Sequence, residues 1–509
     1  MILEVVAALT LVALGAPLAA FAGLKSWGIA AAAPLLGAFL YVTVGALQVV
    51  LYLPTFPWLT LTLAALVAAA VGWMARRQFA GAAIALVVSA ATAGAIAAVT
   101  FAFTLVKWTA DSMVYLAIGG LLATDRYHDV PAPGIALERL IGVGLLHAPA
   151  HHDGSIALMG VTPVMAASAL ALSAWMLLTG AGGRVPKKHL VVATALLVAA
   201  PLAANRMVFT AFYINGHVIV GGAVLLLAGS TWLVAAGRAP ARLLAVAAIA
   251  IPAATVTRPD AAALLAVVLI GVVAEARVRP RDRAILVGTL GFATLGWNTF
   301  LATTYVRASL HVPREVLAQI IGGAVLVALA ILLKRPLSAL ACARAIRWSA
   351  LALAGATLGA IALRPGVAAR SVYATVVNMA YRGGWAPMLP LLAIAVIAAL
   401  VLFSLPEARV LAYAVLTFPA VALILAVVRD GAYRVGPGDS LNRSWAHIVP
   451  VALLLVATTV LLGRPRREPR EATALRAEDD LGDLNGVEGS TLAEVVANDE
   501  EREPPAAIN

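Results

Sequence analysis

The chain has 509 residues, of which 62% are hydrophobic and only 12% are charged, with a formal net charge of +11. Soluble globular domains are about 45–50% apolar and about 25% charged, so this composition excludes a soluble globular protein. A transmembrane β-barrel is excluded as well, because its strands alternate apolar and polar residues. Since every backbone amide in lipid must be bonded within its own segment, long apolar runs predict helices. We therefore expect an all-α, polytopic transmembrane helical bundle.

Apolar blocks follow one another along the chain, many of them with the roughly 17–25 residues that cross about 30 Å of hydrocarbon as a helix. The first block lacks a basic leading segment, so it does not resemble a cleavable signal peptide. Some blocks are short, and we predict 11 to 15 spans. The blocks cover residues 1–22, 29–52, 57–75, 80–106, 156–179, 189–206, 217–235, 242–256, 261–275, 284–300, 315–333, 350–364, 387–404, 408–428 and 446–463.

The C-terminal segment has a different composition from the rest. Residues 464–509 contain 12 acids and 6 bases, whereas the preceding 463 residues contain 13 acids and 30 bases. We divide the chain into a transmembrane helical domain, 1–463, and an acidic tail, 464–509, whose composition is typical of disorder. The single cysteine, Cys342, excludes an internal disulfide, and we expect it at the cytoplasmic side without a redox role.

Lysine and arginine in the short loops predict the orientation of the spans, because these residues are enriched on the cytoplasmic side. With fifteen spans, the basic clusters all fall on one side, together with the acidic tail. The other side, predicted to be extracytoplasmic, has longer loops at roughly 107–155, 207–216, 257–260, 301–314, 365–386 and 429–445. Seven of the eight histidines lie in or next to these loops: His128, His147, His151, His152, His217, His311 and His447. We therefore expect a multi-pass protein of the plasma (inner) membrane whose working face is extracytoplasmic.

The longest predicted outer loop begins with the segment TADSMVYLA, in which Asp111 lies just outside the membrane. A carboxylate at the start of a helix caps free backbone amides and suits the helix dipole, which is a structural explanation for Asp111. The functional alternative is a general base at the membrane interface, which accepts a proton from a sugar or lipid hydroxyl. The sequence leaves both interpretations open.

Two later parts of the same loop are rich in potential metal ligands. They are the segments DRYHD, residues 125–129, and HAPAHHD, residues 147–153. Adjacent histidines and an aspartate can bind a divalent metal, but this spacing matches no metal-binding signature. We favour a solvated polar loop here, and we expect neither a metal nor another cofactor.

Arg258, Pro259 and Asp260 separate two apolar blocks. Pro259 suits the first turn of the following helix, where Asp260 would stabilise the helix N-terminus and pair with Arg258. The alternative is that Arg258 binds a phosphate, for which a planar guanidinium is well shaped. Both interpretations place these residues at the head of a span.

Two further spans begin with polar side chains. The last outer loop delivers Asp439 to a helix start, and Asn442, Arg443 and His447 then enter the membrane, with Arg443 and His447 at i, i+4 on one face. In the same way, Asn215 and His217 open an earlier span, where Asn215 also suits a helix cap. Ionisable residues at the head of a span usually face the bundle or a cavity, although arginine also reaches the headgroups. Two such helix starts favour a shared site.

Four segments in this order resemble the GT-C class of membrane glycosyltransferases: TADSMVYLA, FYINGH, TRPDAAALL and GDSLNRSWAHIVPVALL. The resemblance implies an inverting transferase that moves a sugar from a polyprenyl-phosphate donor to a glycan, lipid or protein acceptor of the cell envelope. It implies that Asp111 is the catalytic base. Residues expected to bind the donor phosphate or the substrate are Asn215, His217, Arg258, Asp260, Arg382, Asn442, Arg443 and His447. The Ala-, Arg- and Gly-rich composition is compatible with a bacterium of high genomic GC content.

Other functions remain open at this stage. A secondary transporter or lipid-linked saccharide flippase also has 11 to 15 spans, but such proteins place ionisable residues near the membrane midplane, whereas here they lie at the ends of spans. A surface-polysaccharide polymerase or ligase would share the outer site and rely more on arginine and histidine. A scaffold without enzymatic activity would use the acidic tail to bind partners. A nucleic-acid partner is not expected, since no basic run is interleaved with aromatic residues.

Overall fold

The computed structural model contains eighteen α-helices and no strand in the part of the chain that it describes. The architecture is an all-α polytopic bundle, as the composition predicts. Ten of the helices are long and apolar enough to cross a membrane, within the described ranges. Those ranges are 1–79, 81–103, 110–129, 141–152, 158, 160–182, 186–204, 215–258, 260–383, 388–405, 408–428, 431–436 and 443–462.

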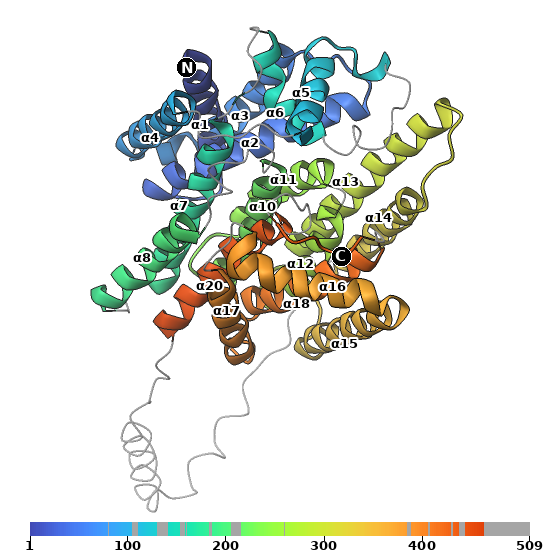
Figure 1. The fold of residues 1–509 in the computed structure, drawn as a ribbon. Helices are drawn as coiled ribbons and strands as arrows, with labels where there is room; N and C mark the ends of the chain where they lie inside the picture. Colours follow the sequence, from blue (N-terminus) through green and yellow to red (C-terminus); the bar gives the residue numbers. More distant parts are fainter. Residues whose placement is uncertain are drawn as a thin grey trace, which may run out of the picture. The chain divides into compact units, whose positions relative to one another are not determined.

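Each of the fifteen apolar blocks coincides with a helix (Figure 1). Of the described helices, eight precede the middle of the chain: α1 (Ile2–Phe21), α2 (Trp27–Val50), α3 (Pro57–Phe79), α4 (Ala83–Ala102), α5 (Ala110–Ala123), α6 (Ile141–His152), α7 (Val161–Ala181) and α8 (Lys187–Ala204). Ten follow: α10 (Asn215–Ala235), α11 (Arg242–Thr257), α12 (Ala261–Val273), α13 (Pro280–Arg307), α14 (Arg314–Leu332), α15 (Ala339–Leu363), α16 (Pro365–Val377), α17 (Met388–Leu402), α18 (Arg409–Val428) and α20 (Val449–Leu462).

Three helices were not among the apolar blocks, namely α5, α6 and α16. They are 14, 12 and 13 residues long, and all three fall in segments that the sequence predicts as outer loops. In addition, α15 begins at Ala339, well before its block, so Arg344 and Arg347 lie on a helix instead of in a loop. Cys342 is on the same helix and is buried, with its Sγ 4.0 Å from the carbonyl oxygen of Val273.

The second helix contains a proline in its interior, Pro34, which removes one backbone hydrogen bond. Serines of two other helices bond the backbone groups around this break. Ser89 of α4 donates to the carbonyl of Ala30 at 2.8 Å. Ser168 of α7 donates to the carbonyl of Ala31 at 2.6 Å and accepts from the amide of Leu35 at 3.2 Å. Side-chain hydroxyls of this kind allow a proline inside an apolar helix without a buried unsatisfied amide.

Contacts between connecting segments gather them at two ends of the bundle. At one end, Thr55, between α2 and α3, donates its amide to the carboxylate of Asp125 at 2.8 Å, and the ring of Tyr52 lies 4.6 Å from that of His128. At the other, Ser26 donates to the carbonyl of Gly81 at 3.3 Å. These groupings agree with the alternation that the basic clusters predict. Which end is extracytoplasmic stays a prediction.

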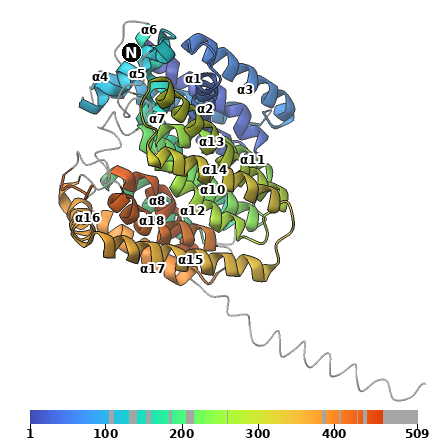
Figure 2. The same cartoon turned by 90° about the vertical axis from the view of Figure 1, so that its right-hand side faces the viewer.

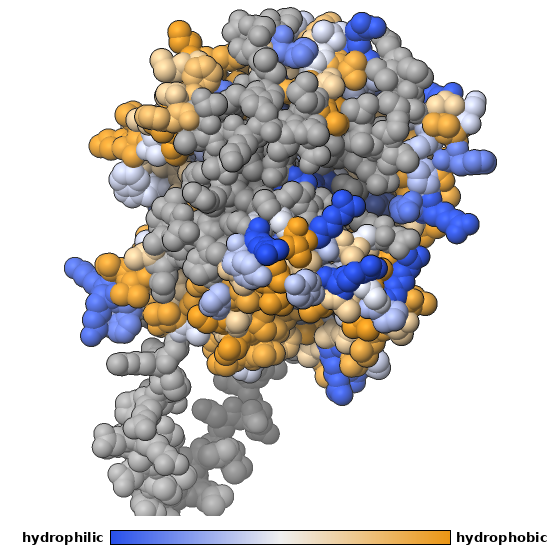
Figure 3. Space-filling view, viewed as in Figure 1, coloured by the Kyte–Doolittle hydropathy of each residue, from blue (hydrophilic) through white to orange (hydrophobic). Residues whose placement is uncertain are grey.

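Several helices present large apolar side chains to the surroundings, which is what a lipid-facing surface requires. Ile394, Ile397, Leu400 and Val401 of α17 are all exposed. Figure 3 shows hydrophobic side chains gathered over the lower part of the face it depicts, where Figure 1 places α17 and α18. We conclude that this is a multi-pass membrane protein.

Candidate functional site

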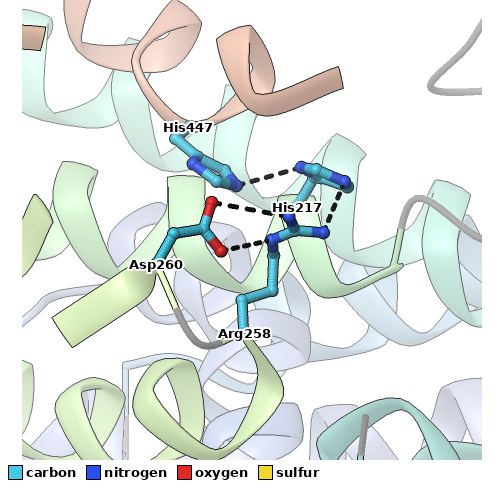
Figure 4. Close-up of polar contacts among 4 residues, drawn as sticks. All are labelled: His217, Arg258, Asp260 and His447. Atoms are coloured by element: carbon cyan, nitrogen blue, oxygen red, sulfur yellow. Dashed lines mark hydrogen bonds and ion pairs between the residues drawn. The ribbon is translucent and has the colours of Figure 1, made fainter. Parts of the chain in front are cut away.

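A buried polar network joins the starts of three helices that are far apart in the sequence (Figure 4). His217 lies in the first turn of α10, and Arg258 and Asp260 lie between α11 and α12. His447 ends η5, a short 3-10 helix (Ser444–His447) that precedes α20. We call these four residues the helix-start network.

The contacts within the network are direct. Nδ1 of His217 lies 3.0 Å from Nε2 of His447, and the two imidazole rings are stacked. Nη1 of Arg258 lies 2.9 Å from Nε2 of His217. On its other side, Arg258 donates from Nε to Oδ1 of Asp260 at 3.0 Å and from Nη2 to Oδ2 at 3.4 Å. One guanidinium therefore connects a carboxylate to a pair of histidines.

All four side chains are almost fully enclosed. The exposed fractions are 1% for His217, 2% for His447, 3% for Asp260 and 9% for Arg258. An isolated ion at such depth loses its hydration without compensation, which costs several kcal/mol even after the protein relaxes. The ion pair between Arg258 and Asp260 offsets this loss and leaves the pair with no net charge. The network is thus stable only when both partners are present.

The contacts also fix the proton positions on the histidines. A guanidinium has only donors, so Nε2 of His217 must accept the hydrogen bond from Arg258. The proton of neutral His217 therefore lies on Nδ1, which donates to Nε2 of His447. Polarity runs in one direction, from the arginine through the first imidazole to the second. Such an arrangement can hold a proton or pass it between the rings.

The local sequence explains the position of the arginine. Arg258 is extended, with φ −144° and ψ 135°, as is typical of a residue before proline, because the ring of Pro259 disfavours the helical region there. This conformation ends α11 and allows the guanidinium to reach the residue two positions later. Asp260 lies at the N-cap of α12, but its side chain makes no capping hydrogen bond. The predicted pairing of Arg258 with Asp260 is confirmed, and it takes the place of capping.

Small residues of α10 allow the other elements to approach. A Cβ atom on Gly216 would lie 3.0 Å from Cγ2 of Thr257 and 3.5 Å from Cγ of Arg258. One on Gly221 would lie 2.6 Å from the carbonyl oxygen of Ala446, a distance that real Cβ atoms do not reach. The backbone of η5 therefore rests directly on α10. This close approach brings His447 to His217.

The final span begins differently from the expectation. Arg443 and His447 were predicted to share one face of an α-helix, whereas Ser444–His447 forms a 3-10 helix and α20 begins only at Val449. Pro450 lies in the first turn of α20, where its missing amide costs nothing, and a tighter turn is common just before such a start. In a 3-10 helix, residues three apart align instead of four. Arg443 is nevertheless buried, with 5% of its surface exposed.

The loop before this span is held by a residue that the sequence analysis missed. Asn378, fully buried, begins the π-helix η4 (Asn378–Arg382). Its Nδ2 donates to the carbonyl of Arg434 at 2.8 Å, and its Oδ1 accepts from the amide of Gly436 at 2.7 Å. The nitrogen and the oxygen of the Asn378 side chain thus both hold the backbone of the loop segment 431–436. An asparagine inside the apolar run VVNMAY was the only signal for it.

Other predicted site residues are placed differently or fall outside the description. Arg382 is exposed, with its guanidinium 5.6 Å from the ring of Tyr381, and it makes no bond to the helix-start network among the described residues. Asp111 lies in the first turn of α5 and Asn215 begins α10, but their side chains lie outside the described residues. Asp439 and Asn442 also lie outside them.

The helices of the longest predicted outer loop are packed close to the network. A Cβ on Gly142, in the first turn of α6, would contact Oγ1 of Thr257, the neighbour of Arg258. Further along α6, His147 is buried and its Nδ1 accepts from the amide of Leu158 at 3.3 Å. Burial lowers the pKa of His147 to about 3. His147 is therefore neutral at ordinary pH.

Comparison with protein families, with curated proteins and with solved structures finds no match to this chain. The described part of the site offers a buried cation with a fixed orientation and two neutral imidazoles, all at the starts of helices. Together they can stabilise an anion and relay a proton.

Proposed function

We propose that the protein is a membrane glycosyltransferase of the GT-C type, which transfers a sugar from a polyprenyl-phosphate donor to an extracytoplasmic acceptor. The observation that carries the proposal is the helix-start network. Three of the four segments that resemble the GT-C class contribute to it: His217 from FYINGH, Arg258 and Asp260 from TRPDAAALL, and His447 from the segment before α20. Segments separated by up to 230 residues in the chain thus supply one site.

In the proposed reaction, Asp111 takes the proton of the acceptor hydroxyl. The hydroxyl oxygen forms a bond to the anomeric carbon from the side opposite to the donor oxygen, so the configuration inverts. The bond between the anomeric carbon and the phosphate oxygen breaks, and polyprenyl phosphate leaves with the electron pair. A general base of this kind contributes about 10²–10⁴-fold to the rate.

Stabilisation of the leaving phosphate is the task proposed for Arg258 and Arg443. Arg258 has five N–H groups, and its contacts with Asp260 and His217 use three of them. We propose that the remaining two donate to phosphate oxygens. Because the guanidinium is already held in place, it needs no reorganisation when charge develops, which is the condition for effective electrostatic catalysis.

The second candidate function is a secondary transporter or lipid-linked saccharide flippase. One observation favours it: ionisable residues enclosed within a membrane bundle often relay protons or line a substrate path. However, the helix-start network lies at the ends of α10, α12 and α20 instead of at their middles. This position favours chemistry at the interface over transport through the midplane.

The test is transfer of a radiolabelled sugar from a polyprenyl-phosphate donor in proteoliposomes. We expect Asp111→Asn to reduce transfer by about 10²-fold or more, because the amide cannot accept the proton. Glu315→Gln is the matched control, since Glu315 is an acid in the first turn of a helix, next to the predicted outer loop 301–314, and it should leave transfer unchanged. Equal transfer by Asp111→Asn and wild type would remove Asp111 from the mechanism. Solute uptake by wild-type vesicles without any sugar transfer would instead support the transporter.

A further inference from the structure

One short helix carries an apolar stripe on the side that faces away from the bundle. On α16, the side that packs inward is formed by Ala368, Ser371, Ala374 and Val377. The opposite stripe follows the helical period and is exposed, with 65% of Tyr373 accessible and Val372 and Val376 beside it. The next turn adds Tyr381, which is 64% exposed.

Positive charge surrounds this stripe. Arg370 and Arg382 are both exposed, and Arg382 lies 5.6 Å from the ring of Tyr381. The neighbouring segment that Asn378 holds adds the exposed Arg434. Residues 364–383 and 431–436 contain four arginines and no acid. The surface is therefore complementary to an anionic layer.

The place of α16 in the chain sets its depth in the membrane. It begins two residues after α15, whose last turns expose Leu358 and Leu363 as a lipid-facing helix does. Figure 2 shows α16 at one end of α15 and turned away from its axis. With 13 residues, α16 is about 20 Å long, too short to cross about 30 Å of hydrocarbon. A helix that starts where a span ends lies at the level of the headgroups.

We propose that α16 and the end of η4 form an interfacial helix surface that binds the anionic headgroups of the surrounding leaflet. The surface consists of Arg370, Val372, Tyr373, Val376, Tyr381 and Arg382, and we call it the α16 surface. Its valines enter the boundary between headgroups and acyl chains by about 5–10 Å. Its tyrosines take the interfacial position that suits an amphipathic ring, and its arginines contact lipid phosphates.

Because the chain has a single cysteine, a site-specific probe can test the depth of this surface. In a Cys342→Ala background, Val372→Cys or Val376→Cys carries a nitroxide, and His311→Cys carries it on an exposed loop as the control. The full-length protein is placed in phosphatidylcholine vesicles with about one quarter phosphatidylglycerol. We expect the probes on α16 to be more accessible to oxygen and less accessible to a water-soluble nickel chelate than the probe at position 311.

Lipid selectivity is measured by energy transfer from a dye at position 372 to labelled lipid in nanodiscs. We expect labelled phosphatidylglycerol to be enriched about five-fold over phosphatidylcholine, which corresponds to ~1 kcal/mol for an arginine near an anionic surface. Arg370→Gln with Arg382→Gln should abolish the enrichment. Lys334→Gln with Arg335→Gln, which removes the same charge from the loop after α14, should preserve it.

Three results would overturn the proposal. The first is a probe at position 372 or 376 that the nickel chelate reaches as readily as the probe at 311. The second is equal energy transfer to the two lipids. The third is a probe shielded from oxygen and nickel alike, which would indicate that a protein covers the surface, either a second copy of the chain or another partner.

Discussion

The helix-start network and the α16 surface both present arginines, yet the two regions differ in every other respect. Arg258 is buried and contacts a carboxylate and an imidazole, whereas Arg382 is exposed and lies over a tyrosine ring. The sequence suggested a phosphate-binding role for both. Their surroundings separate them, because a buried guanidinium is fixed by the partners that its burial requires, while an exposed one exchanges freely between water and headgroups.

Removal of the two arginines should give the largest contrast. Arg258→Ala removes the cation that pairs with the buried carboxylate of Asp260, and we expect a loss of about 3–5 kcal/mol in unfolding free energy. Arg382→Ala is the matched control at the exposed site, with an expected change within about 0.5 kcal/mol. Thermal unfolding in detergent measures both. Equal destabilisation by the two changes would contradict the distinction between the regions.

A double variant at Arg258 and Asp260 separates the role of the ion pair in stability from its role in sugar transfer. The double variant Arg258→Met with Asp260→Leu removes the ion pair without leaving one charge behind, so it should be more stable than Arg258→Ala alone. Sugar transfer should nevertheless be lost in the double variant, because the proposed cation for the leaving phosphate is absent. Retained transfer would show that Arg258 is structural only.

The next effect is the pH dependence of folding stability that His147, a buried histidine outside the network, should cause. Its pKa is lowered to about 3 in the folded protein, whereas an unfolded histidine has a pKa of about 6.5. Between pH 3 and pH 6.5 the imidazole of His147 is protonated in the unfolded state but neutral in the folded state. The contribution of His147 to the free energy of unfolding is therefore fully present above pH 6.5 and is lost as the pH falls. At pH 5 we expect a loss of about 2 kcal/mol relative to pH 7. His147→Gln should flatten this dependence in thermal unfolding, and an unchanged slope would contradict the assignment.

Asn378 connects the two regions, since it begins η4 and holds the loop that leads to the last span. Asn378→Ala removes the two side-chain hydrogen bonds to the carbonyl of Arg434 and the amide of Gly436, and we expect a loss of about 1–3 kcal/mol. If the loop positions Arg443, sugar transfer should fall more than stability alone explains, with an increased KM for the donor. Asn378→Asp, which keeps only the acceptor to Gly436, should give an intermediate KM. A KM unchanged in both variants would limit Asn378 to folding.

The helices were largely predictable, and the site only in part. Long apolar blocks identify spans because the hydrocarbon thickness sets their length, whereas α16 is short and contains Arg370, so the same criterion excluded it. The sequence predicted that His217 and His447, at two helix starts, belong to one shared site. It could not show that they touch, because that contact depends on the close approach of Ala446 to Gly221 across the bundle. The pairing of Arg258 with Asp260 was predictable because it is local.

The broken second helix has a consequence for how the protein is made. Ser168 follows Leu35 by 133 residues, and it supplies the hydroxyl that bonds the backbone on both sides of Pro34. Ser168 lies far beyond the end of α2 in the chain, so it has not yet been translated when α2 first enters the membrane. Until α4 and α7 are in place, the carbonyls of Ala30 and Ala31 lack the hydroxyl donors that they have in the folded protein. The backbone hydrogen bonds of α2 around Pro34 therefore form only after α7 has been synthesised.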